Sequence, residues 1–187
     1  MNKATRATFV TGLVLAAAVL QATPALAHGD DDIGLARLTA QLAKVRQATL
    51  AFDDVHAAIG AGYTPLADKD GIYCIADPAK GTMGIHYVNG GLVSDGVVDP
   101  QKPEAVIYEP MGNGKLRLVA VEYIVFQSAW HADPSHGHRP KLFGHSFDAT
   151  PAGNRFGIPA FYSLHLWLWQ FNPAGLFDDW NPLVQCR

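Results

Sequence analysis

Apolar residues follow a helical spacing over residues 31–60. They are separated by three, four and seven positions, and they are Leu35, Leu38, Leu42, Val45, Phe52 and Ile59. This spacing places them on one stripe of an amphipathic helix. Asp31 or Asp32 can cap the start of the helix, and Gly60 and Gly62 mark its end. The pattern predicts one long helix, with His56 as a core-edge histidine beside the buried stripe.

Shorter β-prone runs follow this helical segment. Residues 83–89 predict a strand that ends at the Gly-Gly pair of residues 90–91. Residues 105–109 and 115–126 flank the turn sequence Met-Gly-Asn-Gly of residues 111–114. An Asn-Gly pair between two β-prone runs is a strong hairpin signal. These residues therefore predict an antiparallel hairpin.

The remaining segments are less regular. Residues 63–80 and 128–160 are rich in residues typical of turns, and we expect both to be loops. The apolar run 161–169 fits a final strand or a short buried helix, because periodicity cannot separate the two over so short a run. We predict an α+β fold in which the long N-terminal helix packs on a mostly antiparallel sheet of four or five strands.

The first 27 residues have the three parts of a secretory signal peptide. Lys3 and Arg6 precede an apolar run over residues 9–20, and residues 25–27 form an Ala-x-Ala cleavage signal. The apolar run is shorter than the roughly 20 residues that a membrane span needs. We expect cleavage after Ala27, export to the periplasm or the medium without stable membrane insertion, and a mature chain of residues 28–187 that forms a single domain.

The charge of the mature chain argues against some partners. Without residues 1–27 the chain keeps 12 basic and 17 acidic side chains, which gives a net charge of −5. Nucleic acids and anionic membranes attract basic surfaces, so neither is an expected partner. A small molecule or a metal ion is the expected partner instead.

Both cysteines lie in the exported part of the chain. Export places Cys74 and Cys186 in a compartment that favours oxidation, and their spacing is not that of a CxxC redox motif. We predict a structural disulfide between them, while a pair of thiols at a metal or redox site is the alternative.

Glu122 interrupts an apolar strand face. Alternate residues of a strand share a face, which here would comprise Leu116, Leu118, Ala120, Ile124 and Phe126. A buried carboxylate must be neutral, paired or bound to a cation.

With the turn centred on residues 113–114, Glu122 would lie opposite Ala105 and Glu109 opposite Leu118. The two glutamates would then share a side but lie about 13 Å apart, too far for a paired-carboxylate site.

Two histidines on predicted strands can supply partners for Glu122. His86 and His165, with Glu122, form the set of two imidazoles and one carboxylate that zinc, iron and copper sites use. We therefore predict a divalent transition metal at these three residues; the alternative is no cofactor, with separate hydrogen-bonded histidines or an arginine or tyrosine partner for Glu122.

Other histidines offer weaker metal sites. A polar loop contains His131, His136 and His138, with His145 beyond it, and can capture a metal or simply be solvated. Cleavage after Ala27 would also make His28 the N-terminal residue, whose amine and imidazole can chelate copper.

Aromatic side chains suggest a second kind of site. Trp167 and Trp169 would share a face with His165 if their segment is extended, near tyrosines of the hairpin such as Tyr123. Large amphipathic rings line ligand clefts as well as fill cores. The chain has no GxSxG, P-loop, dinucleotide-binding or CxxCH motif, so the sequence leaves open whether it is an enzyme.

Several motifs together resemble a group of exported bacterial proteins of uncharacterised activity. These motifs are GIHYVN at 84–89, PEA and YEP within 103–110, LRLV and VEY within 116–123, HxWxWxxNPxG at 165–175 and NPxVxC at 181–186. The resemblance covers roughly residues 45–187. It implies a shared fold and an export route, and it transfers no activity, ligand or catalytic residue.

Three functions fit these observations. The first is an exported metal-binding domain, with a metalloenzyme as one form of it. The second is a non-catalytic module that binds a small molecule in an aromatic cleft. The third is an interaction protein of the cell envelope whose buried polar groups are purely structural.

Overall fold

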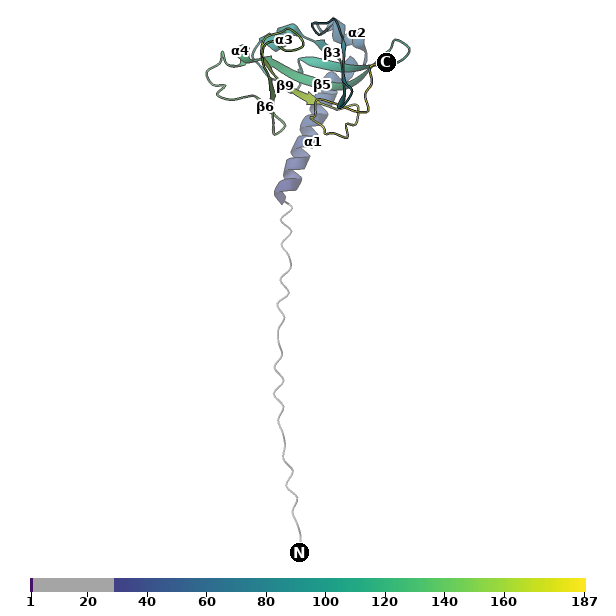
Figure 1. Ribbon diagram of the computed structural model, residues 1–187. Coiled ribbons are helices and arrows are strands. Elements are labelled where there is room, and N and C mark those ends of the chain that lie inside the picture. The colour runs from purple at the N-terminus through teal and green to yellow at the C-terminus, as the bar shows by residue number, and fades with distance from the viewer. Residues whose placement is uncertain (2–28) are drawn as a thin grey trace.

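The computed structural model describes Met1 and residues 29–187, with side chains placed from residue 34 onward (Figure 1). Residues 2–28, which include nearly all of the predicted signal peptide and His28, lie outside the described residues. In the part of the chain that is described, no helix combines the length and the apolar run that a bilayer crossing needs.

The predicted long helix is interrupted. Helix α1 (Gly29–Thr49) continues into a 3-10 turn, η1 (Leu50–Asp53), and the chain then restarts as α2 (Val55–Gly60). Asp54 has an extended backbone, and its carboxylate accepts a hydrogen bond from the His56 backbone N–H at 2.9 Å. Asp54 therefore caps a new helix, and the spacing over residues 31–60 does not continue along a single axis.

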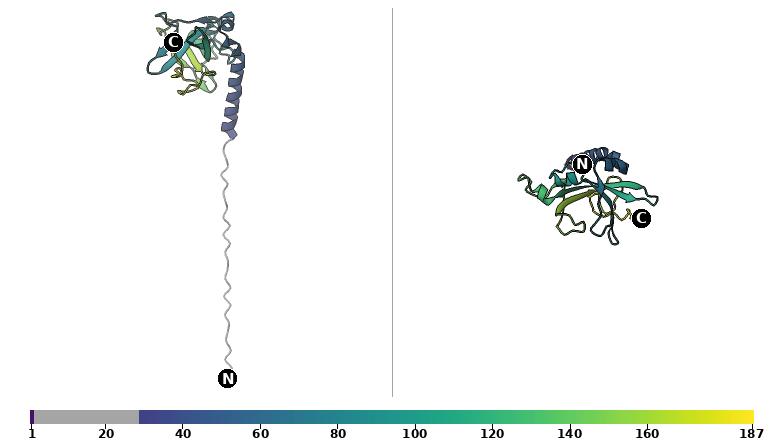
Figure 2. Two further views of the ribbon diagram at one scale, coloured as in Figure 1. Left: turned by 90° about the vertical axis from the view of Figure 1, so that its right-hand side faces the viewer. Right: turned by 90° about the horizontal axis from the view of Figure 1, so that it is seen from above.

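This interruption changes which residues are buried. Val45 is fully buried, but Leu35 and Ile59 are 65% and 48% exposed. The N-terminal part of α1 extends beyond the sheet (Figure 2). His56 is exposed as well, so its interpretation as a core-edge histidine was wrong, because the stripe that would have buried it ends at Asp54.

The helices pack on a seven-stranded antiparallel sheet, which confirms the predicted α+β class. Its strands are β1 (Thr64–Pro65), β2 (Cys74–Asp77), β3 (Gly81–Val88), β4 (Ala105–Pro110), β5 (Leu116–Phe126), β8 (Asp148–Thr150) and β9 (Phe161–Leu166). The order is β1-β3-β4-β5-β9-β8, and β2 also pairs with β3. The hairpin β4–β5 agrees with the Asn-Gly signal, and the last apolar run is a strand over residues 161–166.

Short edge strands account for the difference from the four or five strands expected. Strands β1 and β2 lie within the segment predicted as the loop 63–80, and β8 lies within the segment 128–160. Helix α4 (Gln127–Trp130) overlaps the start of the second segment, which also contains a separate ladder of β6 (Lys141–Leu142) and β7 (His145–Ser146). Helix α3 (Gly90–Ser94) follows β3 directly. Such short strands carry too few residues for an alternating pattern and form only because longer strands offer them a partner.

Both faces of the sheet are covered. Helices α1 and α2 lie along one face, and loops with the C-terminal segment lie along the other (Figure 2). The helix-facing core includes Tyr108, Val121 and Tyr123 packed with Val45 and Ala58. The opposite face forms two further clusters, one around Ile107, Ala120 and Trp167 and one around Ala105, Ile124 and Phe161.

A β-bulge in the hairpin decides which residues of β5 share a face. Ile107 pairs with Ala120, whereas Tyr108 pairs with Leu118, so Val119 is an extra residue on β5. Leu116 and Leu118 therefore pack on the helix side, away from Ile124. The predicted single apolar face from Leu116 to Phe126 was wrong for this reason.

One of the two predicted glutamate pairings is wrong, because the turn is centred on Asn113 and not between Asn113 and Gly114; the extra residue Val119 restores the predicted register beyond the bulge. Glu122 lies opposite Ala105 as expected, but Glu109 lies opposite Arg117 and not opposite Leu118. Glu109 forms an ion pair with Arg117.

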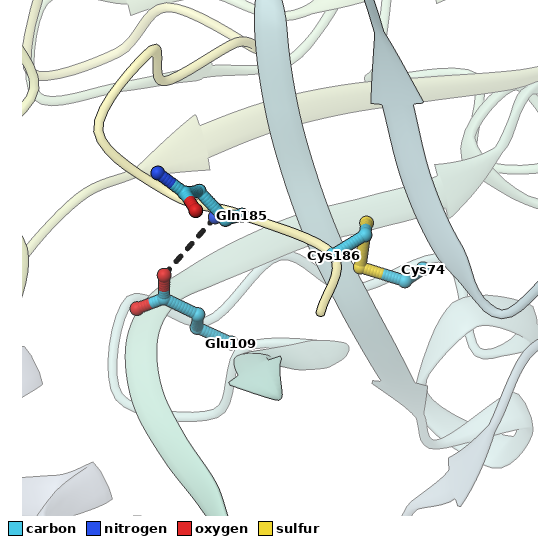
Figure 3. The surroundings of a disulfide bond; sticks show 4 residues. All are labelled: Cys74, Glu109, Gln185 and Cys186. Atoms are coloured by element: carbon cyan, nitrogen blue, oxygen red, sulfur yellow. Dashed lines mark hydrogen bonds between the residues drawn. A yellow bond between two sulfur atoms is a disulfide. The ribbon is translucent and has the colours of Figure 1, made fainter. Parts of the chain in front are cut away.

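The predicted disulfide is present. Cys74 at the start of β2 is bonded to Cys186, with 5.7 Å between the two Cα atoms and 112 positions between them in the sequence (Figure 3). Beside it, the Glu109 carboxylate accepts a hydrogen bond from the backbone N–H of Gln185 at 3.0 Å (Figure 3). These contacts attach the C-terminal segment to the sheet.

Candidate metal centre

The three predicted ligands come together on the sheet face that the loops cover. His86 lies on β3, Glu122 on β5 and His165 on β9. Their exposed fractions are 3%, 5% and 1%. The structure thus brings together residues that are 36 and 43 positions apart in the sequence.

Strand register explains how the three side chains meet. Glu122 lies directly opposite His165 on one side and Ala105 on the other. Strands β3 and β5 are separated by β4 and are therefore about 10 Å apart. On β4, Glu122 lies opposite Ala105 and His86 lies opposite Ile107, so their contact runs diagonally across β4, and the small Ala105 side chain leaves room for Glu122 to lean toward His86.

The distances suit a single metal ion. Glu122 Oε2 lies 3.3 Å from His86 Nε2, and Glu122 Oε1 lies 3.4 Å from His165 Nδ1. Two ligands of a tetrahedral zinc ion, each bound at about 2.1 Å, are about 3.4 Å apart. One potential ligand atom from each residue lies within 4.8 Å of the others, so the atoms must approach one another by at most about 1.4 Å to bind one ion. A buried His/Glu/His group that could hold a metal is therefore present.

Several buried nitrogens in this group lack hydrogen-bond partners. His86 Nδ1 and both ring nitrogens of His165 make no hydrogen bond to any residue that the structure describes. Buried polar atoms are nearly always satisfied by protein, water or an ion. The two rings are nearly perpendicular, with centroids 5.5 Å apart, so they do not satisfy each other. His165 Nδ1 does lie 3.4 Å from Glu122 Oε1 and 3.2 Å from Asp179 Oδ1, so His86 Nδ1 and His165 Nε2 are the nitrogens without a polar partner among the described residues.

The electrostatics of the group favour a bound cation. Burial alone raises the pKa of Glu122, but the attraction of His165 and His86 outweighs burial and brings that pKa below its ordinary value. Burial alone lowers the pKa of His165, but Glu122 and Asp179 outweigh it and raise the pKa. The site therefore holds an anionic carboxylate and attracts positive charge, which a metal ion provides when it displaces the proton.

Asp179 is a fourth residue at the site that sequence reasoning missed. Its Oδ1 lies 3.2 Å from His165 Nδ1, and its side chain is 37% exposed. Burial raises the pKa of Asp179, but the interaction with His165 outweighs burial and lowers it. No local motif marks this residue, because it belongs to an irregular segment that only the packing of the C-terminal region brings over β9.

A pocket opens beside the centre. Its volume is about 220 Å³, and its lining includes His86, Glu122 and Asp179. The apolar residues of the lining are Leu66, Met83, Ile124, Phe156, Ile158 and Phe161. Asp179 and Trp180 also line a larger open hollow of about 570 Å³. An ion at the centre would thus face a small, largely apolar space.

The three aromatic residues predicted as a ligand cleft do not gather. Trp167 is buried beside His165, and its indole N–H donates to the Asp178 carbonyl at 2.6 Å. Tyr123 lies on the opposite face of the sheet, in the core against the helices. Trp169 packs against that same core near Arg46. Tyr123 and Trp169 therefore lie away from the pocket beside the centre, and Trp167 lies in the core next to His165.

The histidines of the 128–160 segment make separate contacts. The His136 ring stacks on Trp130, and His131 Nε2 lies 3.0 Å from the Tyr162 hydroxyl. His145 packs on Phe177, and His138 is exposed. Among the described residues, the one set of three or more histidine, cysteine or acidic groups with metal-like spacing is His86, Glu122 and His165.

A second buried carboxylate gives a prediction about stability. Glu104 is 1% exposed, and its Oε2 accepts a hydrogen bond from the Ile124 backbone N–H at 2.9 Å. Burial raises the pKa of Glu104 from 4.5 to about 8. Between these values the unfolded chain releases the proton that the folded chain keeps, so stability falls as pH rises, by up to about 1.4 kcal/mol per pH unit.

We expect Glu104→Gln to reduce this loss of stability, because glutamine keeps the acceptor oxygen without a charge. Urea unfolding of wild type and variant at pH 5 and pH 8 measures the effect. The free energy of unfolding should fall less with pH in the variant. Equal pH dependence of the two proteins would show that Glu104 does not keep its proton in the folded state.

Comparison of the chain with protein-family models, with curated proteins and with solved structures finds no match. The geometry and chemistry of the site are therefore the basis for inferring a function.

Proposed function

We propose that this protein is an exported metal-binding protein that holds one divalent transition metal through His86, Glu122 and His165. The observation that carries the proposal is the convergence of two buried imidazoles on one buried carboxylate, with His86 Nε2 and His165 Nδ1 3.3 Å and 3.4 Å from the Glu122 oxygens. A buried carboxylate without a positive partner is strongly destabilising. A metal ion shared by the three side chains would neutralise the charge of Glu122.

The donor set narrows the choice of metal. Imidazole suits zinc, copper and iron, whereas magnesium and calcium prefer oxygen ligands. Two histidines and one carboxylate leave coordination positions free for water or for a bound molecule. One free position would face the pocket beside the centre, which is the arrangement that a metalloenzyme needs.

The exported location is part of the same proposal. The predicted signal peptide would direct the chain to the periplasm or the medium, and the Cys74–Cys186 disulfide is typical of such compartments. The resemblance to exported bacterial proteins supports the same route. A structural protein of the cell envelope is the alternative if the centre takes no metal.

Metal analysis of the mature chain, purified without a histidine tag, tests the proposal. After removal of metal with a chelator, the protein should rebind one equivalent of Zn²⁺, Cu²⁺ or Fe²⁺ per chain. At a free metal concentration a hundred times the dissociation constant, stabilisation is about 2.7 kcal/mol. For a chain of this size the melting temperature should therefore rise by about 5–11 °C.

Two alanine variants make the test specific. His165→Ala should lose the bound equivalent, whereas His138→Ala, which removes an exposed histidine, should bind metal like the wild type. The proposal is wrong if the wild type binds less than a tenth of an equivalent of each metal and its melting temperature does not change.

A further inference from the structure

The pocket beside the centre has the size of a small ring. Its volume is about 220 Å³, and an apolar cavity of about 150 Å³ is known to take one benzene molecule. His86 and Glu122 contribute to its lining, and aliphatic and aromatic side chains contribute most of the rest. The space is therefore large enough for one six-membered ring with one or two small substituents.

The charges around the pocket disfavour an anion. Glu122 and Asp179 in its lining are both acidic, and together they balance the two positive charges of a divalent ion at the centre, which leaves no net positive charge for an anion. Of the described residues that line it, Arg155 alone has a guanidinium or ammonium group, and this group is paired with Asp68 at 2.8 Å. Burying an unpaired charge in such surroundings is costly. A neutral molecule fits this environment better than a carboxylate does.

Few polar groups are free to orient a bound molecule. The Asn154 side chain is already engaged, because its amide donates to the carbonyls of Pro151 and Ile158 and its oxygen accepts from the Phe156 backbone N–H. The metal centre with Asp179, the hydroxyls of Thr150 and Ser163, and the indole N–H of Trp180 are the polar groups that remain in the lining. The bound molecule thus needs one polar end and one apolar end.

We propose that this pocket binds a neutral single-ring phenol, with the ring among the apolar side chains and the hydroxyl oxygen directed to the metal centre. This inference rests on the proposed function, because the open position on the metal receives the hydroxyl. A phenol has a pKa near 10, as tyrosine does, and so enters the pocket uncharged at neutral pH. It also presents an oxygen that a transition metal can bind.

Fluorine NMR of two matched probes tests the inference on the mature wild-type chain. We titrate 4-fluorophenol, which is neutral, and 4-fluorobenzoate, which is an anion, into zinc-loaded and metal-free protein. The zinc-loaded protein should bind 4-fluorophenol at least tenfold more tightly than 4-fluorobenzoate. It should also bind 4-fluorophenol at least tenfold more tightly than the metal-free protein does.

Two variants locate the bound ring. Ile158 lies on a loop and lines the pocket, so Ile158→Phe should fill the space and weaken 4-fluorophenol binding at least tenfold while zinc content stays the same. Ile59→Phe makes the same change at an exposed position of α2 and should have no effect. Near-ultraviolet circular dichroism confirms that both variants fold.

The outcomes separate this inference from the proposed function. The inference fails if zinc-loaded wild type does not bind 4-fluorophenol, if it binds 4-fluorobenzoate as tightly, or if Ile158→Phe leaves binding unchanged. If the chain takes up no metal but binds 4-fluorophenol in a manner that Ile158→Phe abolishes, the metal proposal fails and the assignment of the ring to the pocket stands.

Discussion

Glu122→Gln is expected to weaken zinc binding by more than about a hundredfold. Glutamine has nearly the same shape as glutamate but replaces an anionic oxygen ligand with a neutral amide. Glu122 is central to the group, because its two oxygens lie 3.3 Å and 3.4 Å from the nitrogens of His86 and His165. Loss of an outer-shell partner alone typically costs 10- to 100-fold in metal affinity, so loss of a direct ligand should cost more. Competition with a chromophoric chelator measures the dissociation constant.

Glu109→Gln is the matched control for this change. Glu109 is a glutamate on the neighbouring strand β4, and it is 7% exposed, compared with 5% for Glu122. It pairs with Arg117 and the Gln185 backbone and takes no part in the candidate centre. The control should bind zinc as the wild type does. If both variants weaken zinc binding equally, the effect comes from a general loss of stability, and Glu122 is not a ligand.

Removal of the disulfide is expected to be the largest single change in stability. The Cys74→Ala/Cys186→Ala double variant should lose up to about 4.8 kcal/mol in the free energy of unfolding, from the chain entropy of a loop closed over 112 positions. For a chain of this size the melting temperature should fall by about 10–19 °C. Urea denaturation under oxidising conditions measures the difference in free energy.

Reduction gives the control for the disulfide prediction. In the presence of a reductant that opens the bond, wild type and double variant should have the same free energy of unfolding within error. The prediction fails if the double variant is destabilised by less than about 1 kcal/mol without reductant, because closure of the long loop would then contribute little.

Local signals in the sequence predicted the parts of the fold that depend on neighbouring residues. The Asn-Gly turn placed the hairpin β4–β5, and the β-prone run before Gly90 placed β3. The pairing of Glu122 with Ala105 agrees with the count from a turn at residues 113–114, but only because the bulge at Val119 offsets a one-residue difference in the turn. The hairpin and β3 need only short-range geometry, so a single sequence contains their signals.

Features that depend on distant parts of the chain were not predictable in this way. The bulge at Val119 moves Leu116 and Leu118 to the helix side. No residue type near Val119 predicts a bulge. The helix breaks at Asp54 because this residue caps a new helix, although the local sequence pattern also fits an uninterrupted helix. The short strands β1, β2 and β8 exist because long neighbours supply their hydrogen bonds.

The sequence alone determined that Glu122 needs a partner, because an acidic group within a buried apolar strand must be neutralised or bound. It also determined the candidate partners, since His86 and His165 are the histidines on the other long strands. Only the tertiary structure decided that the three side chains meet, because their convergence depends on strand order, on register and on the room that the small Ala105 side chain leaves beside Glu122. The position of Asp179 and the pocket likewise depend on loops that pack over the sheet. Packing between residues far apart in the chain produces no periodic pattern that the sequence could show.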